Sequence, residues 1–97
     1  MAVGLVAEIG GVVSSGAAID FRNGNHFMVN LSANDQISVS NWGGVAGKSG
    51  TITILNANRI TGFKAPFNFR IAQSGFSGTE VFSYFCYASN LIRIVRS

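Results

Sequence analysis

The sequence predicts an all-β fold, a compact antiparallel β-sandwich or jelly-roll-like barrel of about seven to eight short strands. Twelve glycines and one proline are scattered among short β-branched and aromatic segments, which is typical of strands joined by tight turns. No segment keeps a helical period of apolar residues over three turns. The chain of 97 residues is long enough for one such domain and too short for two.

The first predicted strands alternate apolar and polar residues. This alternation is seen in residues 27–31 and again in residues 37–39. The intervening residues 32–35, Ser-Ala-Asn-Asp, form a good four-residue turn, so we expect a β-hairpin here. Residues 51–55 and 67–71 also alternate and are predicted as half-buried strands. No internal repeat is evident in the sequence.

Residues 80–87 form the most apolar predicted strand, and both of its faces are largely apolar. One face holds Val81, Phe85 and Tyr87, and the other holds Phe82, Tyr84 and Cys86. This pattern is typical of a central strand, or of a strand whose second face is covered by a neighbouring chain. We therefore assign four aromatic residues to core or oligomer packing, namely Phe82, Tyr84, Phe85 and Tyr87. Residues 91–96 follow after a short turn and complete a C-terminal hairpin.

The surface of this chain is poor in charge. Apolar residues make up 47% of the sequence and charged residues 11%, with a net charge of +3. Such a surface favours association, so we expect a homo-oligomer. The alternative is a monomeric β domain whose surface is covered by Asn and Ser. Residues 1–16 are interpreted as an apolar, glycine-rich N-terminal arm, and residues 17–97 as a single β domain.

Several classes of protein are excluded by the same sequence. No stretch approaches the ~20 apolar residues that span a bilayer, and the N-terminus lacks the basic start of a secretory signal. We therefore expect no membrane association and synthesis in the cytoplasm. The one cysteine, Cys86, cannot form an internal disulfide.

Residues for catalysis or metal binding are few. His26 is the only imidazole, and no spacing selects it together with Asp20 or Asp35 as a catalytic set. One His and one distant Cys do not make a zinc site. Residues 42–49 contain a Gly-Lys-Ser sequence, but the first glycine of a phosphate-binding loop is replaced by Trp42. We expect no enzyme activity, no metal and no cofactor.

The basic residues are concentrated in the second half of the chain. Residues 48–97 hold six basic residues against the single acid Glu80. A nucleic-acid module clusters such residues with exposed aromatics, whereas here they are spaced singly and the aromatics alternate as core residues do. An acidic protein partner is therefore favoured over nucleic acid. The candidate contacts are Arg59, Lys64, Arg70, Arg93 and Arg96.

A set of Gly-, aromatic- and β-branched-rich motifs extends over about residues 17–95. The motifs are residues 18–21 (Ala-Ile-Asp-Phe), 24–29 (Gly-Asn-His-Phe-Met-Val), 47–54 (Gly-Lys-Ser-Gly-Thr-Ile-Thr-Ile), a loop around residues 60–69, and 77–85 (Ser-Gly-Thr-Glu-Val-Phe-Ser-Tyr-Phe). In these motifs the sequence resembles small β domains in virion proteins of tailed bacteriophages. Such domains occur at the ends of tail fibres and in small proteins that decorate the capsid, typically as trimers. The resemblance therefore implies a structural protein of a virion.

Between these two locations, the short chain without a fibrous shaft favours a capsid decoration or cement protein. Such a protein would bind the major capsid protein on the outer capsid surface and stabilise the shell. Its expected contacts are the basic residues above and the apolar side chains of the arm, namely Val3, Leu5, Val6 and Ile9. The alternative is a tail or fibre-tip component that binds a host-surface glycan or receptor, with Asn41 and Trp42 as the candidate contact.

Overall fold

The structure is a computed structural model that describes residues 12–41, 47–71, 73–88 and 91–96. Within these residues the chain forms nine strands and one short 3-10 helix. The elements are β1 (Val12–Ser15), β2 (Ala18–Asp20), β3 (His26–Asn30), β4 (Asp35–Ser40), β5 (Ser49–Leu55), η1 (Ala57–Arg59), β6 (Ile60–Phe63), β7 (Phe67–Phe69), β8 (Glu80–Ala88) and β9 (Leu91–Arg96). The predicted all-β class is confirmed.

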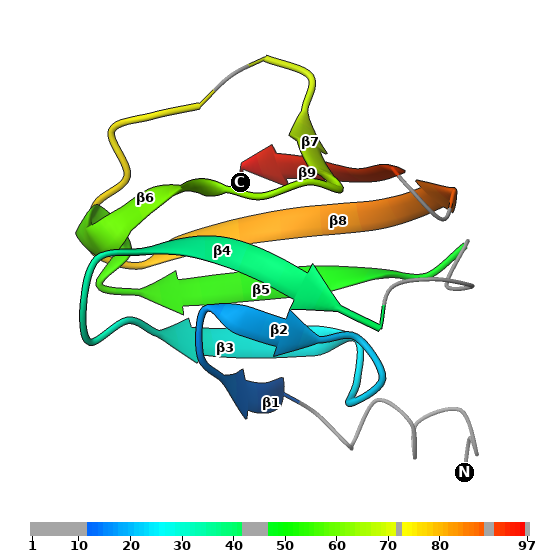
Figure 1. Ribbon diagram of the computed structural model, residues 1–97, viewed down its shortest axis with the longest axis horizontal. Helices are drawn as coiled ribbons and strands as arrows, with labels where there is room; N and C mark the ends of the chain where they lie inside the picture. The colour runs from blue at the N-terminus through cyan, green and yellow to red at the C-terminus, as the bar shows by residue number, and fades with distance from the viewer. Residues whose placement is uncertain (1–11, 42–46, 72, 89–90, 97) are drawn as a thin grey trace, which may run out of the picture.

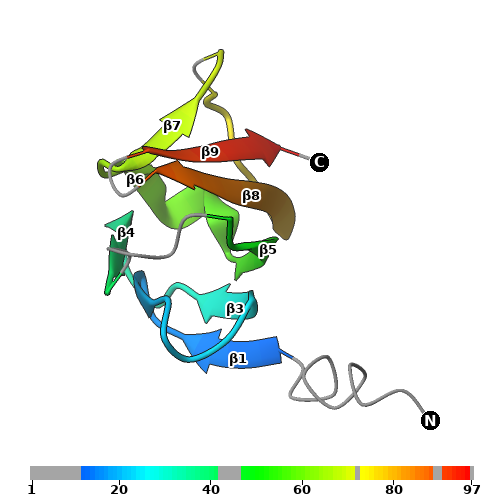
Figure 2. The same ribbon diagram turned by 90° about the vertical axis from the view of Figure 1, so that its right-hand side faces the viewer.

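The strands form two sheets that face each other. The larger sheet has six strands in the order β1-β3-β5-β8-β9-β7, and the smaller sheet has three in the order β2-β4-β6. In Figure 1 the smaller sheet lies in front of the larger one. Figure 2, turned by 90°, shows β4 to one side of β3, β5 and β8. The apolar core lies between the two layers.

Most of the strand pairs are parallel, so the predicted antiparallel sandwich or jelly-roll arrangement is corrected. From β1 to β6, successive strands alternate between the two sheets, and each turn of the chain adds one strand to each sheet. As a result β1, β3 and β5 are parallel, and so are β2, β4 and β6. Apolar alternation has a period of two in both kinds of sheet, and it therefore does not reveal the direction of a neighbouring strand.

The hairpin predicted from residues 27–39 is wrong for the same reason. Both strands exist, as β3 and β4, but they lie in different sheets. Leu31, at the end of β3, is only 3% exposed. Its side chain turns into the core and the chain bends with it, so the next strand crosses to the opposite layer. Val29 and Ile37 then contribute to one core from both sides.

From β1 to β6 the chain winds as a coil between the two sheets, and the turns of this coil differ in length. The sequence therefore shows no regular repeat. Val12 pairs with His26, fourteen residues later, whereas His26 pairs with Thr51, twenty-five residues later. Two successive corners are nevertheless connected. Asn56 adopts a left-handed conformation, and its side-chain amide donates hydrogen bonds to Asn30 Oδ1 at 3.0 Å and to the Leu31 carbonyl at 3.2 Å.

The C-terminal part of the domain is antiparallel, as the sequence predicts. β8 pairs with β5 on one side and with β9 on the other, so it is a central strand that forms a hairpin with β9. Only one face of β8 is buried within the chain. Phe82 and Cys86 are fully buried, whereas Phe85 is 39% and Tyr87 60% exposed. A cover for this second face, expected from a neighbouring chain, remains a prediction.

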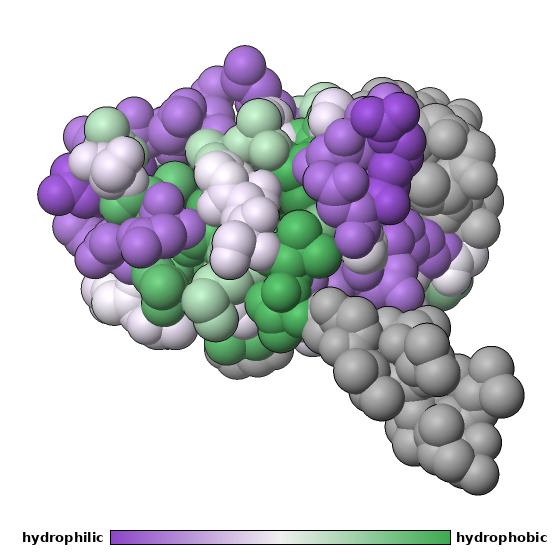
Figure 3. Space-filling view, turned by 90° about the horizontal axis from the view of Figure 1, so that it is seen from below, coloured by the Kyte–Doolittle hydropathy of each residue, from purple (hydrophilic) through white to green (hydrophobic). Residues whose placement is uncertain are grey.

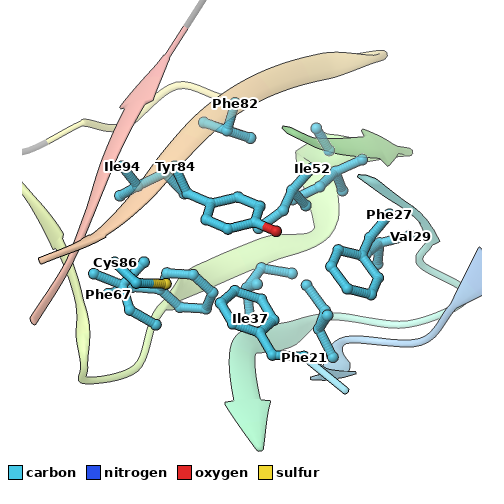
Figure 4. Close-up of a cluster of buried hydrophobic side chains, with 14 of the residues drawn as sticks. Phe21, Phe27, Val29, Ile37, Ile52, Phe67, Phe82, Tyr84, Cys86 and Ile94 are labelled. Atoms are coloured by element: carbon cyan, nitrogen blue, oxygen red, sulfur yellow. The ribbon is translucent and has the colours of Figure 1, made fainter. Parts of the chain in front are cut away.

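The core is built from apolar side chains of both sheets. Phe21 connects the layers: its ring stacks on Phe27 at 5.6 Å and on Tyr84 at 4.9 Å between centroids. Figure 4 shows these rings beside Cys86 and Phe67. Burial raises the pKa of the Cys86 thiol, which keeps the side chain neutral within this core.

β5 passes very close to the loop between β2 and β3. The Asn25 carbonyl accepts a hydrogen bond from the Thr51 backbone N–H at 3.3 Å and another from Tyr84 Oη at 2.7 Å. A Cβ atom on Gly50 would lie 1.9 Å from this carbonyl oxygen. The position therefore requires glycine, because any side chain would separate the strand from the loop.

The boundary predicted between arm and domain is also corrected. Residues 12–15 of the predicted arm form β1, which pairs with β3 at the edge of the larger sheet. The described part of the β domain therefore begins at Val12 instead of residue 17. Residues 1–11, including the predicted contacts Val3, Leu5, Val6 and Ile9, lie outside the described residues.

Candidate binding surfaces

The larger sheet has one side that no described strand covers, here called the outer face. It consists of the side chains of that sheet that point away from the three-stranded sheet. Six apolar residues on it are between 37% and 60% exposed, namely Val12, Met28, Val81, Phe85, Tyr87 and Val95. The strand register aligns them in rows, such as Met28 and Val81 on either side of Thr53. Seen from the β1 side, hydrophobic residues gather in the middle of the molecule between hydrophilic residues (Figure 3).

An aromatic pair and a basic residue stand together on the outer face. The rings of Phe85 and Tyr87 meet edge to face, with centroids 4.6 Å apart. Arg93 pairs with Phe85 across β8 and β9, and its buried Nε has no hydrogen-bond partner within the described residues. A buried N–H without an acceptor is unfavourable. The two rings are the part of this group that a second molecule on the outer face would cover.

The five basic residues proposed as capsid contacts have different environments. Arg59, Lys64 and Arg70 are exposed and follow or end η1, β6 and β7, respectively. Arg93 is half-buried on the outer face. Arg96 is engaged within the chain, because its guanidinium pairs with the Glu80 carboxylate at 2.7 Å. The sequence therefore offers three exposed bases for an acidic partner, and Arg96 is better described as a structural residue.

The Arg96–Glu80 ion pair holds the segment before β8. Arg96 donates hydrogen bonds to the carbonyls of Ser74 at 3.0 Å and Gly75 at 3.3 Å. Glu80 accepts a hydrogen bond from the backbone N–H of Ser77 at 3.2 Å. Together these bonds fix residues 74–77 against the end of the larger sheet. The ring of Phe76 lies in this segment, with the Arg96 guanidinium 4.9 Å from its centroid.

Acid is expected to destabilise the fold, because two carboxyl groups have lowered pKa values. Hydrogen bonds from Arg96 lower the pKa of Glu80 below its ordinary value of 4.5, and those from Arg22 lower the pKa of Asp20 to about 2 from 3.8. The folded state therefore releases these protons more readily than the unfolded state. Their stabilisation is complete above about pH 4.5 and is lost as the pH falls towards 2.

Urea unfolding at pH 7, 4.5 and 2.5 measures this loss, and the double variant D20N/E80Q is the control. The variant should be less stable at pH 7 and lose less stability than the wild type between pH 4.5 and 2.5. Equal losses in the two proteins would show that other groups cause the acid sensitivity.

Lys48 belongs to the Gly-Lys-Ser sequence that was compared with a phosphate-binding loop. In the structure this lysine makes contacts within the fold. Its ammonium group donates to the Gly24 carbonyl and to Asn25 Oδ1, and it lies 5.7 Å from the centroid of the Phe21 ring. Burial lowers the pKa of this lysine. The following residues, Ser49 to Leu55, are strand β5, so the helix that a phosphate-binding loop requires does not follow.

The other sequence candidates are only partly described. Asn41 is exposed at the end of β4, in a left-handed conformation with φ of 55°. Trp42, its proposed partner in glycan binding, lies outside the described residues. His26 Nδ1 lies 2.9 Å from Thr51 Oγ1, a neighbour across the strand pair.

A pocket that sequence reasoning missed lies between β6, β7 and residues 73–76. Its volume is about 520 Å³, and its wall includes the rings of Phe63, Phe67, Phe69 and Phe76. Phe63 joins them, with centroid distances of 5.0 Å to Phe69 and 5.8 Å to Phe76. The sequence assigned aromatics in strands to the core, and indeed these rings are buried or half-buried. The sequence feature that could have indicated this pocket is the presence of Asn58, Asn68 and Gln73 near these aromatic residues.

The described residues contain neither a cluster of metal ligands nor a helix that could span a membrane. No three His, Cys, Asp or Glu side chains in this part of the chain lie together as metal ligands. None of the described helical residues belongs to a helix with the length and hydropathy needed to cross a membrane. Comparison with family models, curated proteins and solved structures gives no match.

Proposed function

We propose that this chain is a structural protein of a bacteriophage virion, a capsid decoration protein that binds the outer capsid surface and stabilises the shell. The resemblance of its sequence to small virion domains supports this role. The observation that carries the proposal is the outer face, where six exposed apolar residues from β1, β3, β8 and β9 lie on one side of the larger sheet. An apolar sheet face of this kind is typical of a subunit that is completed by a neighbouring protein.

In this proposal the outer face forms the contact between copies of the chain, expected to be a trimer. Phe85 and Tyr87 supply the apolar area of this contact. The described residues of the face include one guanidinium and no carboxylate, so a second copy can approach without desolvating an acid. Phe82 and Tyr84, on the inner side of β8, belong to the core of each copy.

Attachment to the capsid then involves the N-terminal arm and the exposed bases. Arg59, Lys64 and Arg70 lie outside the outer face and are available to acidic groups of the major capsid protein. Contacts of this kind at a solvated rim weaken as the salt concentration rises. The virion is accordingly the proposed location of the protein after its synthesis in the host cytoplasm.

Replacing Phe85 by Glu is expected to dissociate the oligomer. The side chain is exposed in one copy, so a carboxylate is tolerated there, but it would be buried without a partner between copies. Sedimentation velocity at micromolar concentration should show an oligomer for the wild type and a monomer for the variant. The control is Gln36→Glu, which adds the same charge on the other sheet. A wild-type monomer across the concentration range contradicts this interface.

Capsid attachment is tested on capsids stripped of decoration proteins. Deletion of residues 2–11 should abolish binding and leave β1 in place, and the triple variant R59E/K64E/R70E should weaken binding at least about tenfold at 0.15 M salt. Circular dichroism checks that both remain folded. Particles that lack the protein should also release DNA at a lower temperature than complete particles. Binding by neither wild type nor variants would contradict the decoration role.

The second candidate is a tail or fibre-tip component that binds a host-surface glycan. The pocket between β6 and β7 is the observation that favours it, because aromatic rings and amides meet there. Copy number separates the two functions, since decoration proteins number in the hundreds per particle and fibre tips in the tens or fewer.

A further inference from the structure

We infer that the pocket between β6 and β7 is a binding site for a neutral saccharide. This inference deepens the second candidate function, on which it rests, and it concerns the aromatic cluster of Phe63, Phe67, Phe69 and Phe76 and not the arm or the outer face. The volume of about 520 Å³ falls within the range of small-ligand sites. It is sufficient for a mono- or disaccharide unit.

The aromatic part of the wall provides the apolar surface that a sugar ring needs. Phe63, Phe69 and Phe76 are half-buried, so part of each side chain is accessible at the pocket. Phe63 contacts both of the other rings edge to face. One side of a pyranose ring carries mainly C–H groups, and these are attracted to the electron-rich face of an aromatic ring.

The remainder of the wall is polar but uncharged. Asn58, Asn68 and Gln73 supply amide groups, and Thr61 and Ser74 supply hydroxyl groups. An amide side chain both donates and accepts hydrogen bonds, as a sugar hydroxyl does. Gln73 Nε2 donates to the Ile71 carbonyl at 3.1 Å, which orients this amide within the segment. The hydroxyl groups of a bound saccharide therefore find both hydrogen-bond donors and hydrogen-bond acceptors in the wall.

The neutral wall discriminates against other classes of ligand. An anionic or cationic ligand would lose its hydration without gaining an opposite charge, because none of the residues that line the pocket is charged. A fully apolar ligand would leave the amides without hydrogen bonds. A saccharide offers C–H groups to the aromatic rings and hydroxyl groups to the amides.

The pocket is also held open before a ligand arrives. Arg96 and Glu80 fix residues 74–77 through three hydrogen bonds to backbone atoms and two between their own side chains, which keeps the Phe76 ring beside Phe63 and Phe82. The charge of Arg96 is balanced by Glu80 in this arrangement. A site that is ordered in advance loses less conformational entropy on binding.

The inference is tested by NMR titration of the full chain with neutral glucose, galactose and N-acetylhexosamine disaccharides. At least one of these is expected to shift the backbone amides of residues 61–62 and 74–76 with millimolar affinity. The double variant N58A/Q73A should bind at least about tenfold more weakly, because two hydrogen bonds are lost. A second variant, Thr61→Arg, places a long side chain at the pocket wall and should block binding without altering the core.

The matched control is Asn34→Ala, which removes an exposed amide from the turn before β4 and should bind as the wild type does. Thermal melting identifies any variant that fails to fold. Three results would overturn the inference: no shifts at 50 mM disaccharide, a preference for sialylated or sulfated saccharides, or occupation of the same amides by an extended peptide alone. None of these results bears on capsid binding, so the two proposals can fail separately.

Discussion

Replacement of Phe82 by alanine is expected to lower the free energy of unfolding by about 3 to 5 kcal/mol. Phe82 is fully buried, and its ring contacts Phe63, Phe69 and Phe76 at centroid distances of 5.3 to 5.9 Å. Its removal leaves a cavity at the centre of this aromatic cluster. Because β8 is bound by neighbours on both edges, its backbone has little freedom to move and fill that space.

The matched variant is Phe85→Ala, three residues further along the same strand. Phe85 is 39% exposed within one copy, so the monomer should lose less than about 1 kcal/mol. Urea unfolding of both variants at low protein concentration gives the comparison. Equal losses at low concentration would show that the two faces of β8 are equally buried, in contradiction to the fold described above.

Substitution of Gly50 by alanine is the second large effect, with an expected loss of roughly 3 kcal/mol, at the upper end of the range for overpacking. The added Cβ would lie 1.9 Å from the Asn25 carbonyl oxygen and 2.9 Å from Tyr84 Oη. The backbone of β5 must therefore move away from the loop. This movement breaks the hydrogen bond of Tyr84 to Asn25 and leaves the buried hydroxyl without that acceptor.

Thermal unfolding of Gly50→Ala measures this loss, and Gly16→Ala is the control. No atom lies within 4 Å of a Cβ built on Gly16, so that substitution should be nearly neutral. The variant Y84F separates the two causes, because it removes the hydroxyl and retains Gly50. If Gly50→Ala were as stable as the wild type, the close approach of β5 to residue 25 would be incorrect.

Strand positions could be predicted from the sequence, whereas strand partners could not. The alternation in residues 27–31, 51–55 and 80–87 appears in the structure as β3, β5 and β8. Alternation records which side of a strand is buried, and it contains no information about the neighbour. Leu31 was assigned to a strand face, but its buried side chain lies at the corner where the chain leaves one sheet for the other.

The candidate surfaces were predictable only in part, for a similar reason. The apolar second face of β8 was visible as Val81, Phe85 and Tyr87, because these residues alternate with the apolar residues of the inner face. Arg96, in contrast, looked like the other basic residues, since its partner Glu80 lies sixteen residues away. The pocket depends on how residues 73–76 fold over β6 and β7, and no local pattern specifies that arrangement.

The sheet order also makes the two ends of the chain mechanically unequal. Among the described strands, β1 is an edge strand with β3 as its single partner, whereas β9 is held between β8 and β7. Tension applied through the N-terminus therefore loads one ladder of hydrogen bonds, and tension applied through the C-terminus loads two. A tether at the N-terminus would fail first by detachment of β1, at a force that leaves the C-terminal hairpin intact. The outermost turn of the coil would then detach first, and the rest of the domain would stay folded.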